Sequence, residues 1–210
     1  MGQKRRSASS RRWLSEHESD QYVQRARTEG WRSRAVFKLE ELDQRDRLLR
    51  PGQRIVDLGA APGGWTQYCV KRCGSKSTVI GIDLLPIDPL PGSVLIQSDF
   101  ESDEGLSALE TALNGQRVDL VLSDMAPNIS GIASADQARA TGLVELALDF
   151  CDRQLVSGGD FVAKAFQGEG FDAWLAQVRE RFKKVSVRKP AASRARSREV
   201  YVVARNFRLG

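Results

Sequence analysis

Histidine, cysteine and long apolar runs are scarce in this sequence of 210 residues. His17 is the only histidine, which excludes any mechanism that needs a pair of histidines. No apolar run approaches the roughly 18 residues of a membrane-spanning helix. The charged residues 1–13 are not followed by the apolar stretch of a secretory signal. Neither membrane insertion nor secretion is therefore expected, and the predicted location is the cytoplasm.

The three cysteines do not form the spacing pattern of a disulfide framework. Cys69 and Cys73 are one helical turn apart and could meet a metal, but no cluster of Cys or His completes a site. With Cys151 the count is odd. We therefore expect free thiols in a reducing compartment and no metal site.

The net charge of +5 conceals an uneven distribution of charge along the chain. Residues 1–34 carry nine Lys and Arg against four acidic residues, and residues 179–210 carry eleven against two. Residues 35–178 carry twelve basic against twenty-one acidic residues. If the fold brings the basic ends together, they form one surface suited to a phosphate backbone. The alternative is a solvated N-terminal tail and a solvated basic face.

Apolar periodicity divides residues 30–210 into the helices and strands of a single domain, preceded by a basic, partly flexible arm at 1–29. Helices are expected at 31–49, 64–73, 102–113, 134–156 and 169–182. Strands are expected at 54–58, 78–82, 94–97, 118–123 and 160–165, followed by 184–189 and 199–206. Short strands that alternate with helices predict parallel βαβ units, and the last two strands, with no helix between them, predict an antiparallel hairpin. The expected fold class is α/β: a doubly wound, Rossmann-like, mostly parallel sheet of seven strands with flanking helices.

A glycine-rich loop follows the first expected strand and predicts a nucleotide-shaped pocket. The segment Asp57-Leu-Gly-Ala-Ala-Pro-Gly-Gly-Trp65 comes directly after an apolar Ile-Val pair. A dinucleotide fingerprint would have its middle glycine at Ala61, where it lets the backbone approach a pyrophosphate. Pro62 is expected to begin the following helix. A ligand without a pyrophosphate suits this loop better, which favours S-adenosylmethionine over NAD.

Two acidic residues end the second and third expected strands, where they could contact such a ligand. Asp83 is placed to accept hydrogen bonds from a ribose diol, and Asp99 suits an adenine amino group. Strand ends of this kind converge on the ligand crevice of open α/β sheets. The alternative is that both carboxylates cap the helices that follow.

A lysine inside an apolar strand and an aspartate at a strand end are the candidate reacting residues. Lys164 lies within Phe-Val-Ala-Lys164-Ala-Phe, where burial of an ammonium group is costly. Desolvation and nearby cations favour the neutral amine, which is the form that acts as a general base. The alternative is a lysine that reaches solvent from an edge strand. Asp124 precedes Met-Ala-Pro127, and the proline is expected to end the strand and hold the carboxylate at the sheet edge. Lys38, taken alone, would be a solvated helix residue.

Five stretches of the chain, taken together, carry a family resemblance. They are Arg32-Ser-Arg-Ala-Val-Phe-Lys38-Leu, the glycine loop 57–65, Leu122-Ser-Asp124-Met-Ala-Pro-Asn128, Val162-Ala-Lys164 and 193–201. These stretches resemble the FtsJ/RrmJ (RlmE) family of S-adenosylmethionine-dependent RNA ribose 2′-O-methyltransferases, and within it the bacterial enzymes of large-subunit (23S) ribosomal RNA. The match extends over almost the whole chain without a large insertion.

The resemblance implies a methyltransferase fold, a catalytic tetrad and a cofactor site. The tetrad falls on Lys38, Asp124, Lys164 and Glu199. Cofactor contacts fall on Gly59, Gly63, Gly64, Trp65, Asp83, Asp99 and Asp124. It further implies that Lys164 is the base and that Lys38 is a second cation that orients the hydroxyl. Asp124 would hold Lys164 and touch the cofactor. Glu199 would be the least critical member of the tetrad. No metal is required, because the sulfonium already activates the methyl group.

The expected methyl acceptor is RNA, because arginines flank the proposed catalytic residues in sequence. They are Arg32, Arg34, Arg194, Arg196 and Arg198, and they would contact phosphates. Trp31 either stacks on a base or belongs to the core. The resemblance implies a uridine of 23S ribosomal RNA on the assembling or assembled large subunit, and a monomer is the default expectation. The rivals are a nicotinamide dehydrogenase, a ribosome-assembly factor without catalysis, and a related methyltransferase of transfer RNA or a messenger cap.

Overall fold

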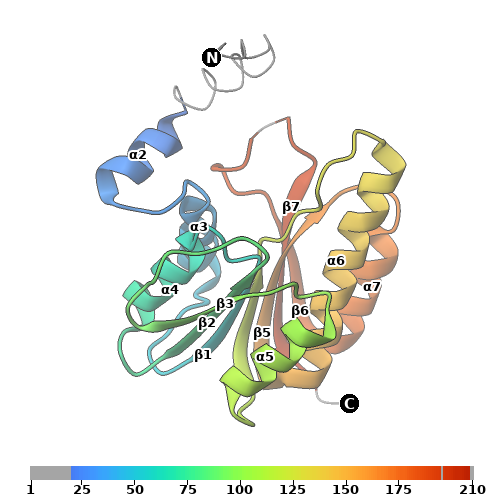
Figure 1. The fold of residues 1–210 in the computed structure, drawn as a ribbon. Helices are drawn as coiled ribbons and strands as arrows, with labels where there is room; N and C mark the ends of the chain where they lie inside the picture. Colours follow the sequence, from blue (N-terminus) through green and yellow to red (C-terminus); the bar gives the residue numbers. More distant parts are fainter. Residues whose placement is uncertain (1–19, 195, 209–210) are drawn as a thin grey trace, which may run out of the picture.

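The computed structural model describes residues 20–194 and 196–208, which are built around a seven-stranded sheet (Figure 1). Residues 1–19 of the expected N-terminal arm lie outside the described part. The helices are α2 Gln21–Glu29, α3 Val36–Asp46, α4 Gly64–Cys73, α5 Asp103–Leu113, α6 Ala133–Gln154 and α7 Phe171–Arg181. The strands are β1 Arg54–Leu58, β2 Thr78–Asp83, β3 Ser93–Gln97, β4 Val118–Ser123, β5 Leu155–Phe166, β6 Phe182–Arg188 and β7 Glu199–Phe207.

The sheet has the order β3-β2-β1-β4-β5-β7-β6. Strands β1 to β5 are parallel, whereas β7 is antiparallel to β5 and β6 is antiparallel to β7. The strand order reverses between β1 and β4, and at such a point the loops after neighbouring strands diverge and leave room for a ligand. The predicted doubly wound α/β fold, with its C-terminal antiparallel hairpin, is confirmed.

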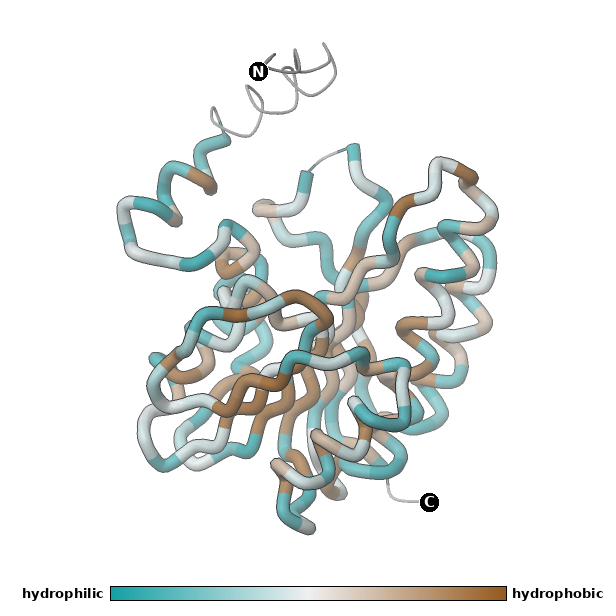
Figure 2. The backbone as a smooth tube through the Cα atoms, viewed as in Figure 1, coloured by the Kyte–Doolittle hydropathy of each residue, from teal (hydrophilic) through white to brown (hydrophobic). Residues whose placement is uncertain are grey.

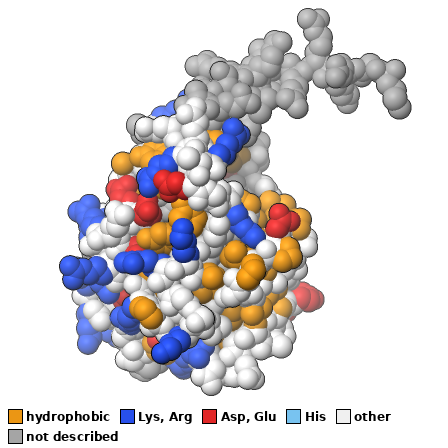
Figure 3. Space-filling model, turned by 90° about the vertical axis from the view of Figure 1, so that its left-hand side faces the viewer, with side chains coloured by type: hydrophobic (Ala, Val, Ile, Leu, Met, Phe, Trp, Pro, Cys, Tyr) orange, Lys and Arg blue, Asp and Glu red, His pale blue; other side chains and the backbone are white. Residues whose placement is uncertain are grey.

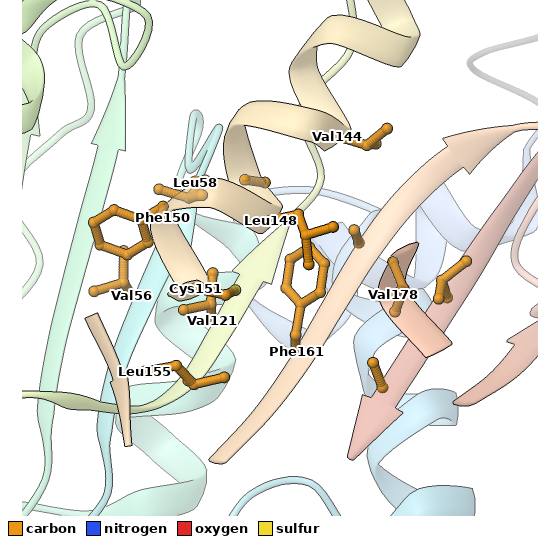
Figure 4. Packing of buried hydrophobic residues seen from close by; sticks show 14 of the residues in the cluster. Val56, Leu58, Val121, Val144, Leu148, Phe150, Cys151, Leu155, Phe161 and Val178 are labelled. Carbon is orange, nitrogen blue, oxygen red and sulfur yellow. The ribbon is translucent and has the colours of Figure 1, made fainter. Parts of the chain in front are cut away.

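Alternation of side chains along the strands divides the core into two layers. Ile55 packs with α3 and α4 on one face, whereas its neighbour Val56 packs with α5 and α6 on the other. Figure 2 shows apolar residues concentrated along the central strands, and Figure 4 shows the second layer, in which Phe150 and Leu148 of α6 lie over the sheet. Both faces are therefore covered, and the chemistry is confined to the carboxyl edge of the sheet.

Several expected boundaries were wrong for identifiable reasons. The first helix begins at Val36 rather than at 31 and ends at Asp46, because Arg47 adopts a left-handed conformation with φ 51°. Leu48 and Leu49 are buried beyond the helix, so their apolar pattern mimicked a further turn. Strand β5 begins directly after α6, five residues earlier than expected. Pro62 lies in the loop, because α4 begins only at Gly64.

Helix α2 forms the last part of the expected arm 1–29 and packs on α3. Asp20 caps it by accepting a hydrogen bond from the Tyr22 N–H at 2.9 Å, and Val23 is buried. The guanidinium of Arg25 lies 4.1 Å from the ring centroid of Phe37 in α3. No helix within residues 20–194 and 196–208 is long and apolar enough to cross a membrane.

Candidate active site

Side-chain alternation places three polar residues on the α3/α4 face of the sheet, at the ends of neighbouring strands. Asp124 follows β4 two residues after buried Leu122, which faces α3 and α4. Lys164 of β5 lies opposite Tyr201 of β7 in the antiparallel register. Because paired residues in a sheet point to the same face, both side chains are directed toward α3 and α4.

The four predicted catalytic residues form two ion pairs. Lys164 Nζ donates to the Asp124 carbonyl at 2.6 Å and lies 3.2 Å from Asp124 Oδ1. Lys38 Nζ, on α3, lies 2.8 Å from Oε1 of Glu199, the first residue of β7. The Lys164 side chain is only 8% exposed, so its ammonium depends on Asp124 rather than on water. The structure therefore brings together residues that are more than 160 positions apart in sequence.

Tyr201 connects the two ion pairs, and sequence reasoning missed it. Its hydroxyl donates to Asp124 Oδ1 at 2.7 Å, and the Lys38 ammonium lies 5.5 Å from its ring centroid. The Trp65 ring packs against it at 5.8 Å between centroids. The available signal was its spacing from Glu199, since residues two apart in a strand share a face. In a Val-rich strand, however, a tyrosine resembles an ordinary core residue.

Burial and neighbouring charges shift the pKa values of two of these groups. Burial alone would raise the pKa of Glu199, but the ammonium of Lys38, with smaller contributions from Ser193 and Lys164, holds that pKa below its ordinary value. Burial, followed by the nearby carboxylates of Asp124 and Glu199, raises the pKa of Tyr201 well above its ordinary value. Tyr201 is therefore a hydrogen-bond donor throughout the neutral range, and Glu199 is an anion.

The glycine loop passes so close to its neighbours that side chains would not fit. A Cβ on Gly59, whose φ is +77°, would lie 2.7 Å from Met125 Cγ. On Gly63 it would lie 2.9 Å from the Arg32 guanidinium, and on Gly64 2.3 Å from the hydroxyl of Ser33. The segment before α3 therefore packs directly on the loop. Trp65 belongs to the same contact, because its indole N–H donates to the Ala35 carbonyl at 2.8 Å.

Asp83 and Asp99 both lie at the carboxyl edge of the sheet and accept backbone hydrogen bonds. Asp83 Oδ2 accepts from the Ala61 N–H of the glycine loop at 2.9 Å, and Oδ1 accepts from Leu85 N–H at 2.8 Å. Asp99 Oδ1 accepts from Glu101 N–H at 2.9 Å in the turn before α5. Each ionised carboxylate retains further lone pairs, so these bonds leave capacity for a ligand.

Asp57 is a buried carboxyl beneath the glycine loop. Its Oδ2 accepts from the Thr66 hydroxyl at 2.7 Å, whereas Oδ1 has no hydrogen-bond partner among the described residues. Burial is the main cause that raises the pKa of Asp57 to about 7, and the nearby carboxylates of Asp124 and Asp83 add to it, against the hydrogen bond from Thr66. Three acidic groups therefore surround the ends of β1, β2 and β4.

The five predicted RNA-contacting arginines have different environments. Arg32 donates to the carbonyls of Asp88 at 2.6 Å and Pro89 at 2.8 Å. Arg34 is half-buried and binds both the Asp20 carboxylate and the Ala192 carbonyl. Arg194 is half-buried, whereas Arg196 and Arg198 are exposed. Arg32 and Arg34 thus also hold the protein's own segments in place.

The described parts of the two basic ends are neighbours. Arg34 contacts the loop between β6 and β7, and burial together with the nearby Arg194 lowers its pKa. Glu41 of α3 accepts from the Ala191 N–H at 2.7 Å, which holds the same loop. Figure 3 shows Lys and Arg side chains spread over the face that carries α2, with fewer acidic ones between them. Basic segments from the two ends of the described chain therefore lie beside the Lys38–Glu199 ion pair.

Two further expectations concern Trp31 and metals. Trp31 is half-buried, its ring lies 5.9 Å from that of Tyr68, and the Lys71 ammonium lies 4.7 Å from its centroid. These contacts make it part of the α4 packing. Within residues 20–194 and 196–208, no group of three or more His, Cys, Asp or Glu is placed to hold a metal ion.

Comparison with known proteins identifies the relatives of the chain. The family model of FtsJ-like methyltransferases matches residues 31–207. The fold is similar to that of a Plasmodium falciparum protein provisionally named a ribosomal RNA methyltransferase, with 28% identity, a TM-score of 0.75, and coverage of 84% of this chain and 98% of that one. It is also similar to a Clostridium thermocellum protein provisionally named an rRNA methylase, with 17% identity, a TM-score of 0.57, and coverage of 80% and 96%. The second likeness concerns the fold alone.

Proposed function

The chain belongs to the FtsJ-like methyltransferase family, and from this premise we propose that it transfers a methyl group from S-adenosyl-L-methionine to the ribose 2′-hydroxyl of a uridine in 23S ribosomal RNA. The observation that carries the proposal is the presence of two neighbouring ion pairs, Lys164–Asp124 and Lys38–Glu199, with Tyr201 next to both. They place two amines and two carboxylates beside the glycine loop. A non-catalytic assembly factor would not need this arrangement.

The residues at the carboxyl edge of the sheet suit S-adenosylmethionine. Asp83 and Asp124 end the strands on either side of β1 and offer carboxylate oxygens to a ribose diol and to a cationic group. Beneath them, Asp57 adds a buried oxygen that has no hydrogen-bond partner among the described residues. Gly59, Gly63, Gly64, Trp65 and Asp99 would complete the cofactor site. When bound, S-adenosylmethionine supplies an electrophilic methyl group on a sulfonium.

The residues of the chain have distinct proposed roles in the transfer. Lys164, as the neutral amine, accepts the proton of the 2′-hydroxyl as that oxygen attacks, and Asp124 keeps the amine at the sheet edge through two contacts. Lys38 orients the hydroxyl, and Glu199 holds Lys38. Burial excludes water from Lys164. Alignment of the hydroxyl with the methyl group contributes a large part of the rate enhancement.

RNA is the proposed substrate because of the basic segments and the named relative. Arg194, Arg196 and Arg198 lie on the loop that leads into Glu199, and Arg34 holds the base of that loop. Phosphate contacts made there would place a ribose beside the ion pairs. The name of the Plasmodium falciparum relative, a ribosomal RNA methyltransferase, supports our choice of ribosomal RNA over transfer RNA as the substrate of this chain.

A radiolabelled transfer assay tests the substrate. The protein would be incubated with labelled S-adenosylmethionine and, separately, with undermethylated large subunits, naked ribosomal RNA, transfer RNA and capped messenger RNA. Label should enter large-subunit RNA at the highest rate. Preferential labelling of transfer RNA or of the cap would assign the chain to a related activity, and no labelling of any RNA would exclude methyl transfer.

The variant Lys164→Met tests the base. It removes the amine but keeps most of the side-chain volume, so methyl transfer should fall by about 10² or more. The dissociation constant for S-adenosylmethionine, measured by calorimetry, should change little. Lys184→Met, on an exposed position of β6, is the matched control and should transfer normally. Near-normal transfer by Lys164→Met would show that another group takes the proton.

A further inference from the structure

The loop between β4 and α6 exposes two isoleucines that the roles above do not use. Ile129 is 84% exposed and Ile132 is 63% exposed, in the loop that begins with Asp124. Single apolar residues scattered over a surface are ordinary. Two large apolar side chains in one short loop beside a reactive site point instead to contact with a ligand.

Hydrogen bonds tie this loop to the first turns of α6. Asp136 accepts from the Ser130 N–H at 2.8 Å and hydroxyl at 2.7 Å, and from the Gly131 N–H at 3.1 Å. Arg139 donates to the Asn128 carbonyl at 3.3 Å. These bonds hold the backbone next to both isoleucines. A loop fixed in this way loses little conformational freedom when its side chains meet a ligand.

Further hydrogen bonds connect the start of α6 to the arginines proposed to contact RNA. The Gln137 amide donates to the carbonyls of Phe166 at 3.3 Å and Glu169 at 3.1 Å, at the end of β5 and in the loop after it. In the same loop, the Gln167 N–H donates to the Arg198 carbonyl at 3.1 Å. Figure 1 shows the β4–α6 loop and the β6–β7 loop both rising above the carboxyl edge of the sheet. The isoleucines therefore extend the proposed RNA surface from the β6–β7 loop toward α6.

We propose that Ile129 and Ile132 pack against an unstacked nucleobase of the RNA, next to the nucleotide that receives the methyl group. The inference rests on the proposed function. The Lys164 side chain is only 8% exposed, so a ribose reaches its amine only if the nucleotide leaves the stack. The neighbouring base then loses its stacking partner. Apolar side chains such as isoleucine and leucine take this place in proteins that unstack DNA.

The size and charge of the loop favour a nucleobase over a protein partner. Two side chains offer far less area than the roughly 800 Å² that each partner buries in a stable protein interface, but they match the face of one base. The only acidic side chain between positions 125 and 139 is Asp136, whose carboxylate already binds the loop. The loop can therefore approach phosphates without strong repulsion.

Paired substitutions test the contact through RNA binding. Ile129→Ala combined with Ile132→Ala should weaken the binding of large-subunit RNA about fivefold, at the low end of the effect of removing an aromatic stacking residue. The slope of log K against log salt concentration should not change, because no phosphate contact is lost. The Tm should not fall, since both side chains are exposed in the unbound protein. Ile129→Leu combined with Ile132→Leu should retain the affinity, and Val94→Ala, at an exposed position of β3, is the control.

Photo-crosslinking from position 129 identifies what the loop contacts. The variant Ile129→p-benzoylphenylalanine, irradiated on undermethylated large subunits, should attach to ribosomal RNA at a nucleotide adjacent to the methylated one. Attachment to a distant nucleotide, to a ribosomal protein or to a second copy of the chain, or no attachment, would overturn the proposal. Unchanged RNA binding by the paired alanine variant, or a loss that follows a lower Tm or a smaller salt slope, would also overturn it. Methyl transfer by the unaltered protein is measured in parallel, and its absence would instead contradict the proposed function itself.

Discussion

At the scale of single residues, Tyr201 is the group that lies next to both ion pairs. Its hydroxyl donates to Asp124 Oδ1, the same oxygen that faces Lys164. The Lys38 ammonium lies 5.5 Å from the centroid of its ring. The phenol thus fixes the carboxylate that fixes the proposed base. A hydrogen bond to a buried charged group contributes more to stability than one between neutral groups.

Tyr201→Phe should therefore lower the free energy of unfolding by about 1.5–3 kcal/mol, measured by urea denaturation. The ring, and with it the packing on Trp65, is retained. Tyr22→Phe provides the matched control, because the Tyr22 ring also packs on an aromatic residue, Phe37, at 5.7 Å. Equal effects of the two substitutions would show that the bond to Asp124 contributes nothing.

The buried carboxyl of Asp57 should make stability depend on pH. Burial raises its pKa from 3.8 to about 7, so between these values the folded protein keeps a proton that the unfolded chain loses. Rising pH then favours the unfolded state, and the contribution of Asp57 to the unfolding free energy falls up to about pH 7 and is constant above it. The lowered pKa values of Asp46 and Glu199 act in the opposite direction.

Comparison with Asp57→Asn isolates this contribution. The difference in unfolding free energy between the unaltered protein and the variant should decrease from pH 5 to pH 7 and then level off. Urea titrations at four pH values suffice for the measurement. A difference that stays constant over the whole range would mean that Asp57 is not protonated in the folded protein.

Some site residues could be predicted from the sequence, and others could not. Lys164 was predictable because an amine in an apolar strand requires a compensating partner. Its partner Asp124 followed only from the family resemblance, because no local pattern reveals that the strands of the two residues are adjacent. Tyr201 was missed because its only signal is a spacing of two residues from Glu199, and a tyrosine in a strand is otherwise ordinary.

At the scale of elements, the loop between β1 and α4 requires glycine for a packing reason. Gly59 has a φ of +77°, and a Cβ there would overlap Met125, which follows Asp124. A side chain at this position would therefore prevent the close contact between the loop and the segment after β4. Gly142, within α6, has open space around the position of its missing Cβ and an ordinary helical φ.

Alanine at these two positions should have opposite effects. Gly59→Ala should destabilise the protein by more than about 1 kcal/mol and weaken cofactor binding, because the backbone conformation is strained and Met125 must move. Gly142→Ala should stabilise it by about 0.5–1 kcal/mol through helix propensity. Thermal denaturation and cofactor calorimetry measure both. Tolerance of Gly59→Ala would exclude close packing between the loop and Met125.

Element boundaries were predictable only where turn residues mark them. The helix α4 and strand β1 were located because a glycine loop separates them. The start of β5 was missed, because α6 passes into it at Leu155 without a glycine or proline at the junction. The register of the pairing between β5 and β4 also shifts between Val118 and Leu120. The alternation of apolar residues in the sequence does not predict this shift.

At the scale of the whole molecule, the described parts of the two basic ends converge on one region. Arg34 joins α2 to the loop before β7, so an N-terminal segment and a C-terminal segment share a surface beside the ion pairs. The uneven distribution of charge along the sequence predicted such a surface only if the fold brings the two basic ends of the chain together. That condition depends on the strand order, in which β7 lies beside β5.

RNA binding should depend on salt in a way that these arginines control. Replacing Arg196 and Arg198 with Gln should weaken binding and reduce the slope of log K against log salt concentration by about 2. Filter binding with large-subunit RNA at four salt concentrations measures this slope. The pair Arg153→Gln and Arg179→Gln removes the same charge from exposed positions on α6 and α7. A similar change in slope for both pairs would show that charge alone matters, not its location.

The chemical identity of the methylated atom tests the central claim most directly. Large-subunit RNA would be incubated with the protein and S-adenosylmethionine, digested to nucleosides and analysed by mass spectrometry. The account predicts a single new product, 2′-O-methyluridine, which Lys164→Met does not form. A methyl group on a base, or formation of the ribose product at an undiminished rate by Lys164→Met, would contradict it.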